Sequence, residues 1–347
     1  MKKYLLVFIA AGISLQACEE NSMEKPEPNT FADSPSQENN SWVLLDDNIL
    51  ANDSEHFDLE GFGFAIGSKG YLAGGRYEYT EFREYDTETK ILTRKNNRFD
   101  NLSDPAAFSI GSMGYAGSGT GQAGGGELYS TPDFYQYNPQ TDRWILKAPL
   151  PEHLSEAIGF SLNGKGYIGV GRTDTIRFNE SGQLETYFYP SRSFYEYSPA
   201  SNCWIKKSDF PGDMRTDAVA FTIGDKAYVG TGLKFDGTGS LKDFWEYDPN
   251  TDKWTKKADF PGASRYDAVG FSIGNKGYIG TGQSLPQIYH KDFWEYDPST
   301  NSWTQIDDFA GGFRRQMVYF STQSKGYVAG GEYEGERFDF WEFDPSK

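Results

Sequence analysis

The sequence predicts an all-β fold made of several small sheets arranged in a ring. Three observations support this expectation. Segments 242–254 and 291–303 are nearly identical, a glycine-punctuated pair of strand patterns recurs about every 50 residues, and helical periodicity is absent. Repeats of this length that contain only short, aromatic-rich strand patterns are typical of radial or stacked arrays of sheets.

Composition and charge limit the possible partners. The chain has 347 residues and a net charge of −17, and an excess of carboxylates this large repels phosphate backbones. We therefore expect no nucleic-acid partner. Aromatic residues make up 16% of the chain and glycines number 39, which fits an all-β protein with a large core.

The first residues form a processing signal. Basic Met1–Lys3 precedes an apolar run at 4–15, which is too short to span a bilayer, and Leu15–Cys18 closes the segment. This segment resembles a bacterial lipoprotein signal, which implies a signal peptide over 1–17 and a lipid on Cys18. An ordinary secretory signal is the alternative. The resemblance implies export and anchoring to the outer membrane, and it leaves the periplasmic or surface face open.

Residues 18–40 are expected to form a flexible tether behind the lipidated cysteine. This stretch is polar, contains three prolines and has one aromatic residue, so it cannot bury enough surface to fold. Only Cys203 remains after it, which excludes an internal disulfide. Contact with the membrane is expected only through the anchor.

Residues 41–347 divide into six units, each opening with a strand that contains a marker phenylalanine. These residues are spaced 44 to 61 positions apart: Phe64, Phe108, Phe160, Phe221, Phe271 and Phe320. A short turn and a second strand of the Lys-Gly-Tyr type follow, and after a variable loop comes an aromatic third strand. A tight turn then leads to a fourth strand, which carries tryptophan in four of the units: Trp144, Trp204, Trp254 and Trp303.

The count of strands predicts how the ring closes. The sequence ends just after the sixth third strand, and residues 41–46 match the fourth strand at 302–307. An N-terminal strand that completes the last sheet leaves no open sheet edge. We therefore predict a six-bladed propeller closed by its N-terminal strand.

These repeats resemble the Kelch-repeat propellers. The resemblance rests on the Tyr-aliphatic-x-x-Gly second strand, the aromatic third strand and the tryptophan seven residues beyond it, and it covers residues 41–347. One feature departs from the family pattern. The glycine doublet is present only at 74–75 and 330–331, and the other four units have Gly-x-Gly.

Candidate ligand-binding residues lie four positions before each marker phenylalanine. All but one of these six residues are carboxylates. They are Glu60, Asp104, Glu156, Asp217, Asp267 and the exception, Gln316. Two positions earlier, the last three units have Arg215, Arg265 and Arg314. One interpretation is structural, with each acid paired to an arginine or a backbone group. The other is that clustered guanidinium groups bind a carboxylate or polyhydroxyl ligand, oriented by Glu156, Asp217 and Asp267.

The remaining motifs indicate neither a metal nor a cofactor. His56, His153 and His290 are dispersed over three units, whereas ligands of one zinc ion must converge. No nucleophile elbow or phosphate loop is visible. The loops between second and third strands are rich in tyrosine, and the longest, at 172–192, is expected to act as a partial lid.

Three functions follow from these features. The first is a lipid-anchored, monomeric protein that binds a glycan, peptide or envelope protein at one mouth of the central channel. The second is a sugar-acid isomerase, because the repeats are similar to those of Kelch-type N-acetylneuraminate epimerases. The third is a radical copper oxidase resembling galactose oxidase, and the dispersed histidines and the position of Cys203 argue against it.

Overall fold

A computed structural model describes residues 41–47, 61–74, 81–97, 102–122, 128–178, 181 and 184–347. The predicted signal peptide, Cys18 and the tether lie outside these residues, as do Glu60 and His56. The chain divides into units 1–36 and 37–347, and only the second contains described residues. All regular elements in the described ranges are strands, and none of these residues forms a helix able to cross a membrane.

Most strands belong to four-stranded antiparallel sheets, of which the described residues form six. Sheet 1 consists of β2 (Phe62–Ile66), β3 (Lys69–Gly74), β4 (Glu81–Asp86) and β5 (Ile91–Arg94). Sheet 2 consists of β7 (Ala106–Ile110), β8 (Met113–Gly117), β11 (Phe134–Asn138) and β12 (Arg143–Leu146). Sheet 3 consists of β13 (Ile158–Leu162), β14 (Lys165–Phe178), β15 (Leu184–Ser198) and β16 (Cys203–Lys206).

The second half of the chain repeats this order. Sheet 4 consists of β18 (Val219–Ile223), β19 (Lys226–Gly230), β21 (Phe244–Asp248) and β22 (Lys253–Lys256). Sheet 5 consists of β23 (Val269–Ile273), β24 (Lys276–Gly280), β27 (Phe293–Asp297) and β28 (Ser302–Ile306). Sheet 6 consists of β29 (Val318–Ser321), β30 (Gly326–Ala329), β31 (Phe340–Phe343) and β1 (Trp42–Asp46).

Short strand pairs join the loops at one end of the sheets. These are β6 (Leu102–Ser103) with β9 (Thr120–Gln122) and β10 (Leu128–Ser130), β17 (Arg215–Thr216) with β20 (Leu233–Lys234), and β25 (Gln283–Ser284) with β26 (Ile288–Tyr289).

Sheet 6 is built from both ends of the described chain. Strand β1 pairs antiparallel with β31, with Trp42 opposite Phe343 and Leu44 opposite Trp341. The Trp42 ring packs against Phe293, Phe309 and Phe343 at centroid distances of 4.9, 4.8 and 4.8 Å. The segment 41–46 therefore lies on the outer edge of the last sheet and is held there by a buried aromatic cluster.

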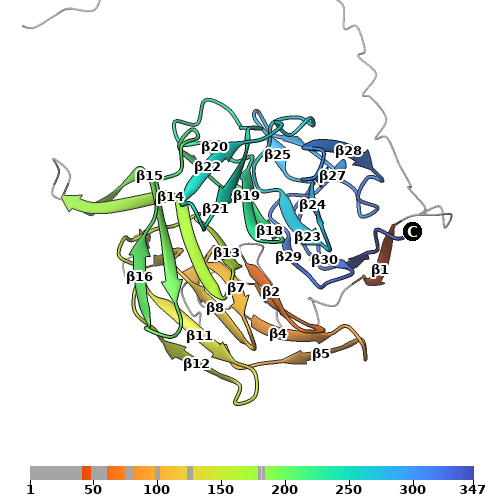
Figure 1. Cartoon of the computed structure of the whole chain (residues 1–347), viewed down its shortest axis with the longest axis horizontal. Coiled ribbons are helices and arrows are strands. Elements are labelled where there is room, and N and C mark those ends of the chain that lie inside the picture. Colours follow the sequence, from red (N-terminus) through yellow and green to blue (C-terminus); the bar gives the residue numbers. More distant parts are fainter. Residues whose placement is uncertain are drawn as a thin grey trace, which may run out of the picture. The chain divides into compact units, whose positions relative to one another are not determined.

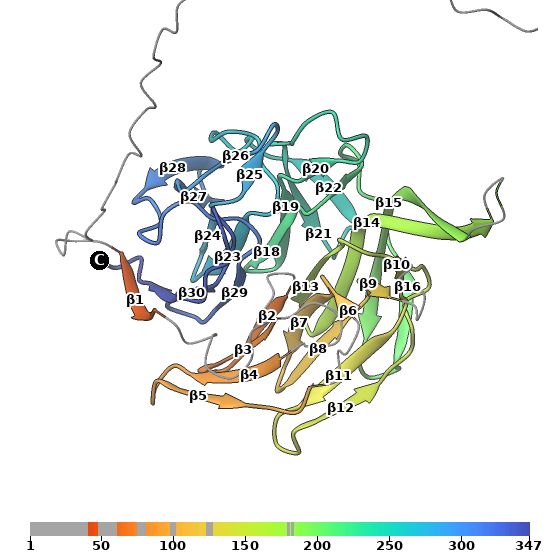
Figure 2. The same ribbon diagram turned by 180° about the vertical axis from the view of Figure 1, so that it is seen from behind.

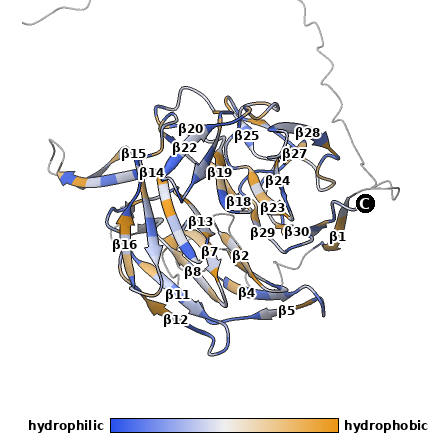
Figure 3. Ribbon diagram, in the orientation of Figure 1, coloured by the Kyte–Doolittle hydropathy of each residue, from blue (hydrophilic) through white to orange (hydrophobic). Residues whose placement is uncertain are grey.

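The six sheets surround a common centre (Figure 1), and the same arrangement is visible from behind (Figure 2). The strands nearest the centre are β2, β7, β13, β18, β23 and β29, and each contacts its neighbour on both sides, including β29 with β2. Hydrophobic and hydrophilic residues are interspersed along the strands (Figure 3), since both faces of each sheet meet another sheet near the centre and water near the rim.

Neighbouring sheets interlock because five of the six marker phenylalanines pack on a glycine in the second strand of the next sheet. A Cβ atom on that glycine would lie only 2.0 to 2.5 Å from the ring, and the pairs are Phe320 with Gly70, Phe64 with Gly114, Phe108 with Gly166, Phe221 with Gly277 and Phe271 with Gly326. Sheet 4 has Ala227 at this position, buried in one cluster with Phe160. The glycine of the Lys-Gly-Tyr pattern thus sets the spacing between sheets.

The outer strands are linked by the fourth-strand tryptophans. Each indole N–H donates to the carbonyl that follows the outer strand of the preceding sheet, at 2.9 to 3.1 Å, in the pairs Trp144 with Asn96, Trp204 with Ala148, Trp254 with Ser208 and Trp303 with Ala258. Phenylalanine rings near the centre therefore join neighbouring sheets, and the indole hydrogen bonds add a second link nearer the rim between successive sheets from 1 to 5.

The backbone conformation explains why four units can have Gly-x-Gly in place of the glycine doublet. The middle residue has a positive φ of 55° to 61° at Ser118, Val170, Thr231 and Thr281, and the doublet residue Gly330 has a φ of 66°. The backbone is therefore the same in these five sheets, whether or not the position is glycine. A left-handed conformation is costly for β-branched residues, so the surrounding sheet must enforce it.

The segment expected to be a lid is a hairpin instead. Residues 165–178 and 184–198 pair as the long strands β14 and β15, and the outer half extends away from the ring in both views (Figures 1 and 2). Phe178 near its end is 73% exposed. This placement argues against the predicted lid over the mouth.

We predict that Gly277→Val destabilises the protein, because its side chain would collide with the buried ring of Phe221. Overpacking of this kind costs about 1–3 kcal/mol of unfolding free energy, which urea denaturation measures. Asn275→Ala, in the exposed turn just before, is the control and should change stability by less than about 0.5 kcal/mol. Equal stability of the two variants would contradict this account of sheet spacing.

Candidate functional site

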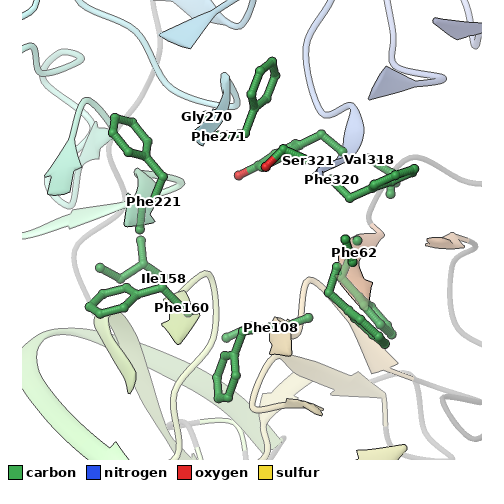
Figure 4. A pocket seen from close by; sticks show the side chains of 18 of the residues that line it. Phe62, Phe108, Ile158, Phe160, Phe221, Gly270, Phe271, Val318, Phe320 and Ser321 are labelled. Carbon is green, nitrogen blue, oxygen red and sulfur yellow. The ribbon is translucent and has the colours of Figure 1, made fainter. Parts of the chain in front are cut away.

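The centre of the ring contains a cavity of about 290 Å³ lined by the innermost strands. The rings of Phe108, Phe221 and Phe271 point away from this opening and toward the sheets (Figure 4). Small residues line it in their place, because the inner strands approach each other closely. A Cβ atom on Gly63, for example, would lie 2.2 Å from the carbonyl oxygen of Tyr319.

One large side chain interrupts this lining. The residue before the marker phenylalanine is glycine or alanine in sheets 1 to 5 (Gly63, Ala107, Gly159, Ala220 and Gly270), whereas sheet 6 has Tyr319. Burial raises the pKa of Tyr319 to about 12, although a backbone hydrogen bond from Gly270 opposes the shift. Tyr319 therefore narrows the cavity from one side. The sequence comparison of marker positions had not singled out this residue.

The predicted ring of acids lies one residue outside this cavity. Its described members all have positive φ angles of 48° to 55°, and they are Asp104, Glu156, Asp217, Asp267 and Gln316. Asp267 and Gln316 are further joined by a backbone hydrogen bond from Gln316 N to Asp267 O of 3.1 Å. A conformation this unusual for non-glycine residues recurs in five sheets, so these positions share one local backbone geometry at the start of the inner strands.

The three predicted arginines have a different role from the acids. Arg215 and Arg265 are fully buried, and Arg314 is 5% exposed. The guanidinium groups of Arg215 and Arg265 each donate two hydrogen bonds, of 2.7 to 2.9 Å, to the carboxylates of Asp243 and Asp292, respectively. Arg314 donates to Asp339 at 2.9 Å.

Further contacts complete these ion pairs. The Nη1 atoms of Arg215 and Arg265 donate to the carbonyls of Thr231 and Thr281 at 2.9 Å, and the guanidinium groups lie over Phe210 and Phe260. Burial disfavours ionisation of Asp243 and Asp292, but their arginine partners outweigh it and lower the pKa of both carboxyls. These contacts favour the structural interpretation for the three arginines. A guanidinium group that is open to a ligand must therefore come from another arginine.

Arg172 provides one open guanidinium group at the mouth. Its Nη2 atom lies 2.5 Å from Glu156 Oε1, its guanidinium carbon lies 3.9 Å above the Phe188 ring, and its side chain is 24% exposed. Burial and the neighbouring Asp217 carboxylate raise the pKa of Glu156 to about 8, although Arg172 opposes the shift. Asp217 accepts a hydrogen bond of 2.8 Å from the Thr216 hydroxyl.

Arg315 provides the second open guanidinium group, near Asp267. Its Nη1 atom lies 3.7 Å from Asp267 Oδ2, its Nε atom donates to Glu332 at 3.0 Å, and its side chain is 25% exposed. Gln283 donates to the same Asp267 oxygen at 2.9 Å. Sheets 3 and 6 thus each place one arginine beside ring carboxylates.

Sequence reasoning missed both arginines, although each lies at a position that recurs in the other units. The residue before each position of the acid ring forms a β-bridge with the residue that follows the Gly-x-Gly or Gly-Gly motif of the same sheet. Two of these pairs are Ser155 with Arg172 and Arg315 with Glu332. The corresponding pairs in the other described sheets are Ser103 with Thr120, Thr216 with Leu233 and Tyr266 with Gln283. Aligning these two positions across the units would have revealed Arg172 and Arg315.

Aromatic rings flank this charged mouth between sheets 5 and 6. Tyr289 and Tyr333 meet edge to face at 5.2 Å, and Tyr333 lies 5.3 Å from Phe313. Together with Phe188 beside Arg172, the mouth combines carboxylates, two guanidinium groups and aromatic faces. This set of groups suits a ligand that offers several hydroxyls and an apolar ring face.

The histidines and the cysteine do not contribute a metal site among the described residues, where no group of three or more His, Cys, Asp or Glu side chains could hold a metal ion. His290 Nε2 lies 3.0 Å from the Ser284 hydroxyl, but burial and the charge of Arg265 lower the pKa of His290 to about 4. Such an imidazole is a weak base for activating the serine. Cys203 is exposed on β16.

Comparisons with known proteins identify the fold class. No protein-family model matches the chain, and no curated protein matches it either. Among solved structures, the chain is similar to YjhT, with a TM-score of 0.68 and 16% sequence identity over 84% of this chain and 96% of that one. Together with the radial sheets, this likeness defines an all-β, β-propeller fold. At this identity it shows the fold alone.

Because some of these arginines are buried and others are partly exposed, we predict that their substitution lowers the free energy of unfolding by different amounts. Arg265→Leu leaves the Asp292 carboxylate without its partner and should destabilise the protein by about 3–5 kcal/mol in urea denaturation. Arg315→Leu removes a partly exposed pair and should cost less than about 1 kcal/mol. Similar losses for both variants would contradict the structural role assigned to Arg265.

Proposed function

We propose that residues 41–347 form a six-bladed propeller of the Kelch class, with sheets 1 to 6 as blades and β1 closing the ring. The circular contacts of the six inner strands support this proposal, as does the pairing of β1 with β31. Export and a lipid on Cys18, inferred from the N-terminal segment, would hold this propeller at the outer membrane of a bacterial envelope.

The protein binds a carbohydrate-type ligand at the mouth formed by Glu156, Arg172, Asp217, Asp267 and Arg315. The observation that carries this proposal is that both arginines are partly exposed and stand beside carboxylates, and that Arg172 also lies over the Phe188 ring. Guanidinium and carboxylate groups exchange forked hydrogen bonds with vicinal hydroxyls, and aromatic rings pack on the apolar faces of sugars. An envelope protein or a peptide is the alternative partner for the same groups.

A glycan array tests this function. The wild-type protein should bind a subset of glycans, and Arg172→Leu with Arg315→Leu should weaken that binding at least tenfold, because both variants remove charge-assisted hydrogen bonds. Lys206→Ala changes an exposed cation on β16 and is the control. Binding to peptides alone would redirect the proposal to a peptide ligand, and glycan binding that survives both arginine changes would refute this mouth as the site.

A sugar-acid isomerase is the second candidate, and Glu156 favours it. Opening a sugar ring requires a proton donor to the ring oxygen and an acceptor for the anomeric hydroxyl proton. A carboxyl group with a pKa of about 8 is protonated at neutral pH and can donate, while the nearby Asp217 is available as the acceptor. Arg172 would hold the substrate carboxylate.

The isomerase candidate predicts faster anomer exchange of fresh α-N-acetylneuraminate, measured by NMR. Because Glu156 donates only when protonated, the acceleration should be full below pH 7 and should fall as pH rises through 8. Glu156→Gln should abolish it at every pH. Wild-type protein without any acceleration would leave glycan binding as the function, and an acceleration that persists in Glu156→Gln would exclude Glu156 as the donor.

A further inference from the structure

A second hollow, with a volume of about 640 Å³, is lined by residues of sheet 4 and of the segments that lead into and out of that sheet, and it shares no residue with the mouth site. Its lining includes the segments 211–213 (Pro-Gly-Asp) and 262–264 (Gly-Ala-Ser), together with Lys242 and Trp245. We call this hollow the side groove. Its volume falls within the range of small-molecule sites, about 300–1,000 Å³.

The side groove contains a cation that the fold does not neutralise. Lys234 lies 4.0 Å from Asp213 and Lys256 lies 3.2 Å from Asp259, so these lysines have partners. The fifth charged residue of the groove, Asp243, is taken by Arg215. Lys242 is exposed and forms no ion pair with any described residue.

The matching position in sheet 5 shows what Lys242 lacks. There Lys291 lies 3.6 Å from Asp308. Sheet 5 has Gln305 where sheet 4 has Lys256, and a glutamine leaves the aspartate free for the other lysine. In sheet 4, Lys256 occupies Asp259, and one ammonium group therefore remains open in the side groove.

Trp245 gives the side groove a fixed aromatic wall. Its indole N–H donates to Asp243 Oδ2 at 2.7 Å, and its ring meets Phe210 edge to face at 5.9 Å. Across the groove, the hydroxyls of Ser240 and Ser264 lie 2.9 Å apart and can each exchange a further hydrogen bond with a ligand. An ammonium, an aromatic ring and a hydroxyl pair thus line one hollow.

We propose that the side groove binds an anionic sugar, with Lys242 contacting its carboxylate or phosphate group and Trp245 packing on the ring. The net charge of −17 repels anions from most of the surface, so an anion that binds must be held by a local cation such as the open ammonium group of Lys242. The hydroxyl pair of Ser240 and Ser264 recognises the ring hydroxyls. This second site goes beyond the ligand proposed at the mouth.

Isothermal titration calorimetry of the full chain with D-glucuronate, glucose 6-phosphate and D-glucose tests the side groove. At least one of the two anionic sugars should bind more tightly than glucose, and the tighter one identifies the anionic group. Lys242→Ala should weaken that binding about tenfold, because a charge-assisted hydrogen bond is lost, and Lys291→Ala should leave it unchanged. Both lysines are surface residues, so neither change threatens folding.

Two further variants separate this proposal from its alternatives. Trp245→Phe keeps an aromatic ring but removes the larger indole face and should weaken the anionic sugar several-fold, whereas Arg172→Leu at the mouth should not affect it. Equal losses in Lys242→Ala and Lys291→Ala would overturn the proposal, as would the absence of any binding by the two anions. Loss only in Arg172→Leu would assign the anionic sugar to the mouth and also overturn it.

Discussion

The contact between a phenylalanine ring and a glycine of the adjacent sheet is the constraint on which the rest of the structure depends. The ring fills the wedge between two sheets, and the missing side chain allows their strands to approach at the depth where the wedge is narrowest. Because the same contact recurs around the ring, every inner strand begins at the same level. The loops that precede these strands therefore meet at one mouth.

The mouth combines a uniform backbone with varied side chains. The ring positions adopt a left-handed conformation in the five sheets where this position is described, yet they carry aspartate, glutamate or glutamine. The bridged positions beside them vary more widely, from serine and threonine to arginine. A repeated scaffold thus holds an asymmetric set of charges, and among the residues that the structure describes the open arginines belong to sheets 3 and 6.

Much of the fold could be predicted from the sequence, because its determinants are local and repeated. The marker phenylalanines, the Lys-Gly-Tyr strands and the fourth-strand tryptophans are visible in each unit, and the match of 41–46 to 302–307 predicted the outer strand of sheet 6. The hairpin at 165–198 was less visible, since its length is peculiar to one unit and its strands lack the repeat pattern.

The candidate site was harder to predict, because the partner of each buried arginine lies more than 20 residues away. The restriction of Arg215, Arg265 and Arg314 to three units suggested a ligand site. The same three units have an aspartate before the aromatic third strand (Asp243, Asp292 and Asp339), and these carboxylates receive the guanidinium groups. Joint inspection of the two positions would have indicated ion pairs. The shift in the pKa of Glu156 depends on burial and on Asp217, and neither is encoded near residue 156.

The pairing of β1 with β31 also constrains when the protein can fold. Trp42 finds its cluster only when Phe343 is present, about 300 residues later in the chain. The last sheet therefore stays incomplete until its carboxy-terminal strand is available for pairing, and its unpaired edge is exposed throughout this period. Contacts of such long sequence separation form slowly, so a chain that has not yet paired these two strands exposes a sheet edge at which it can aggregate.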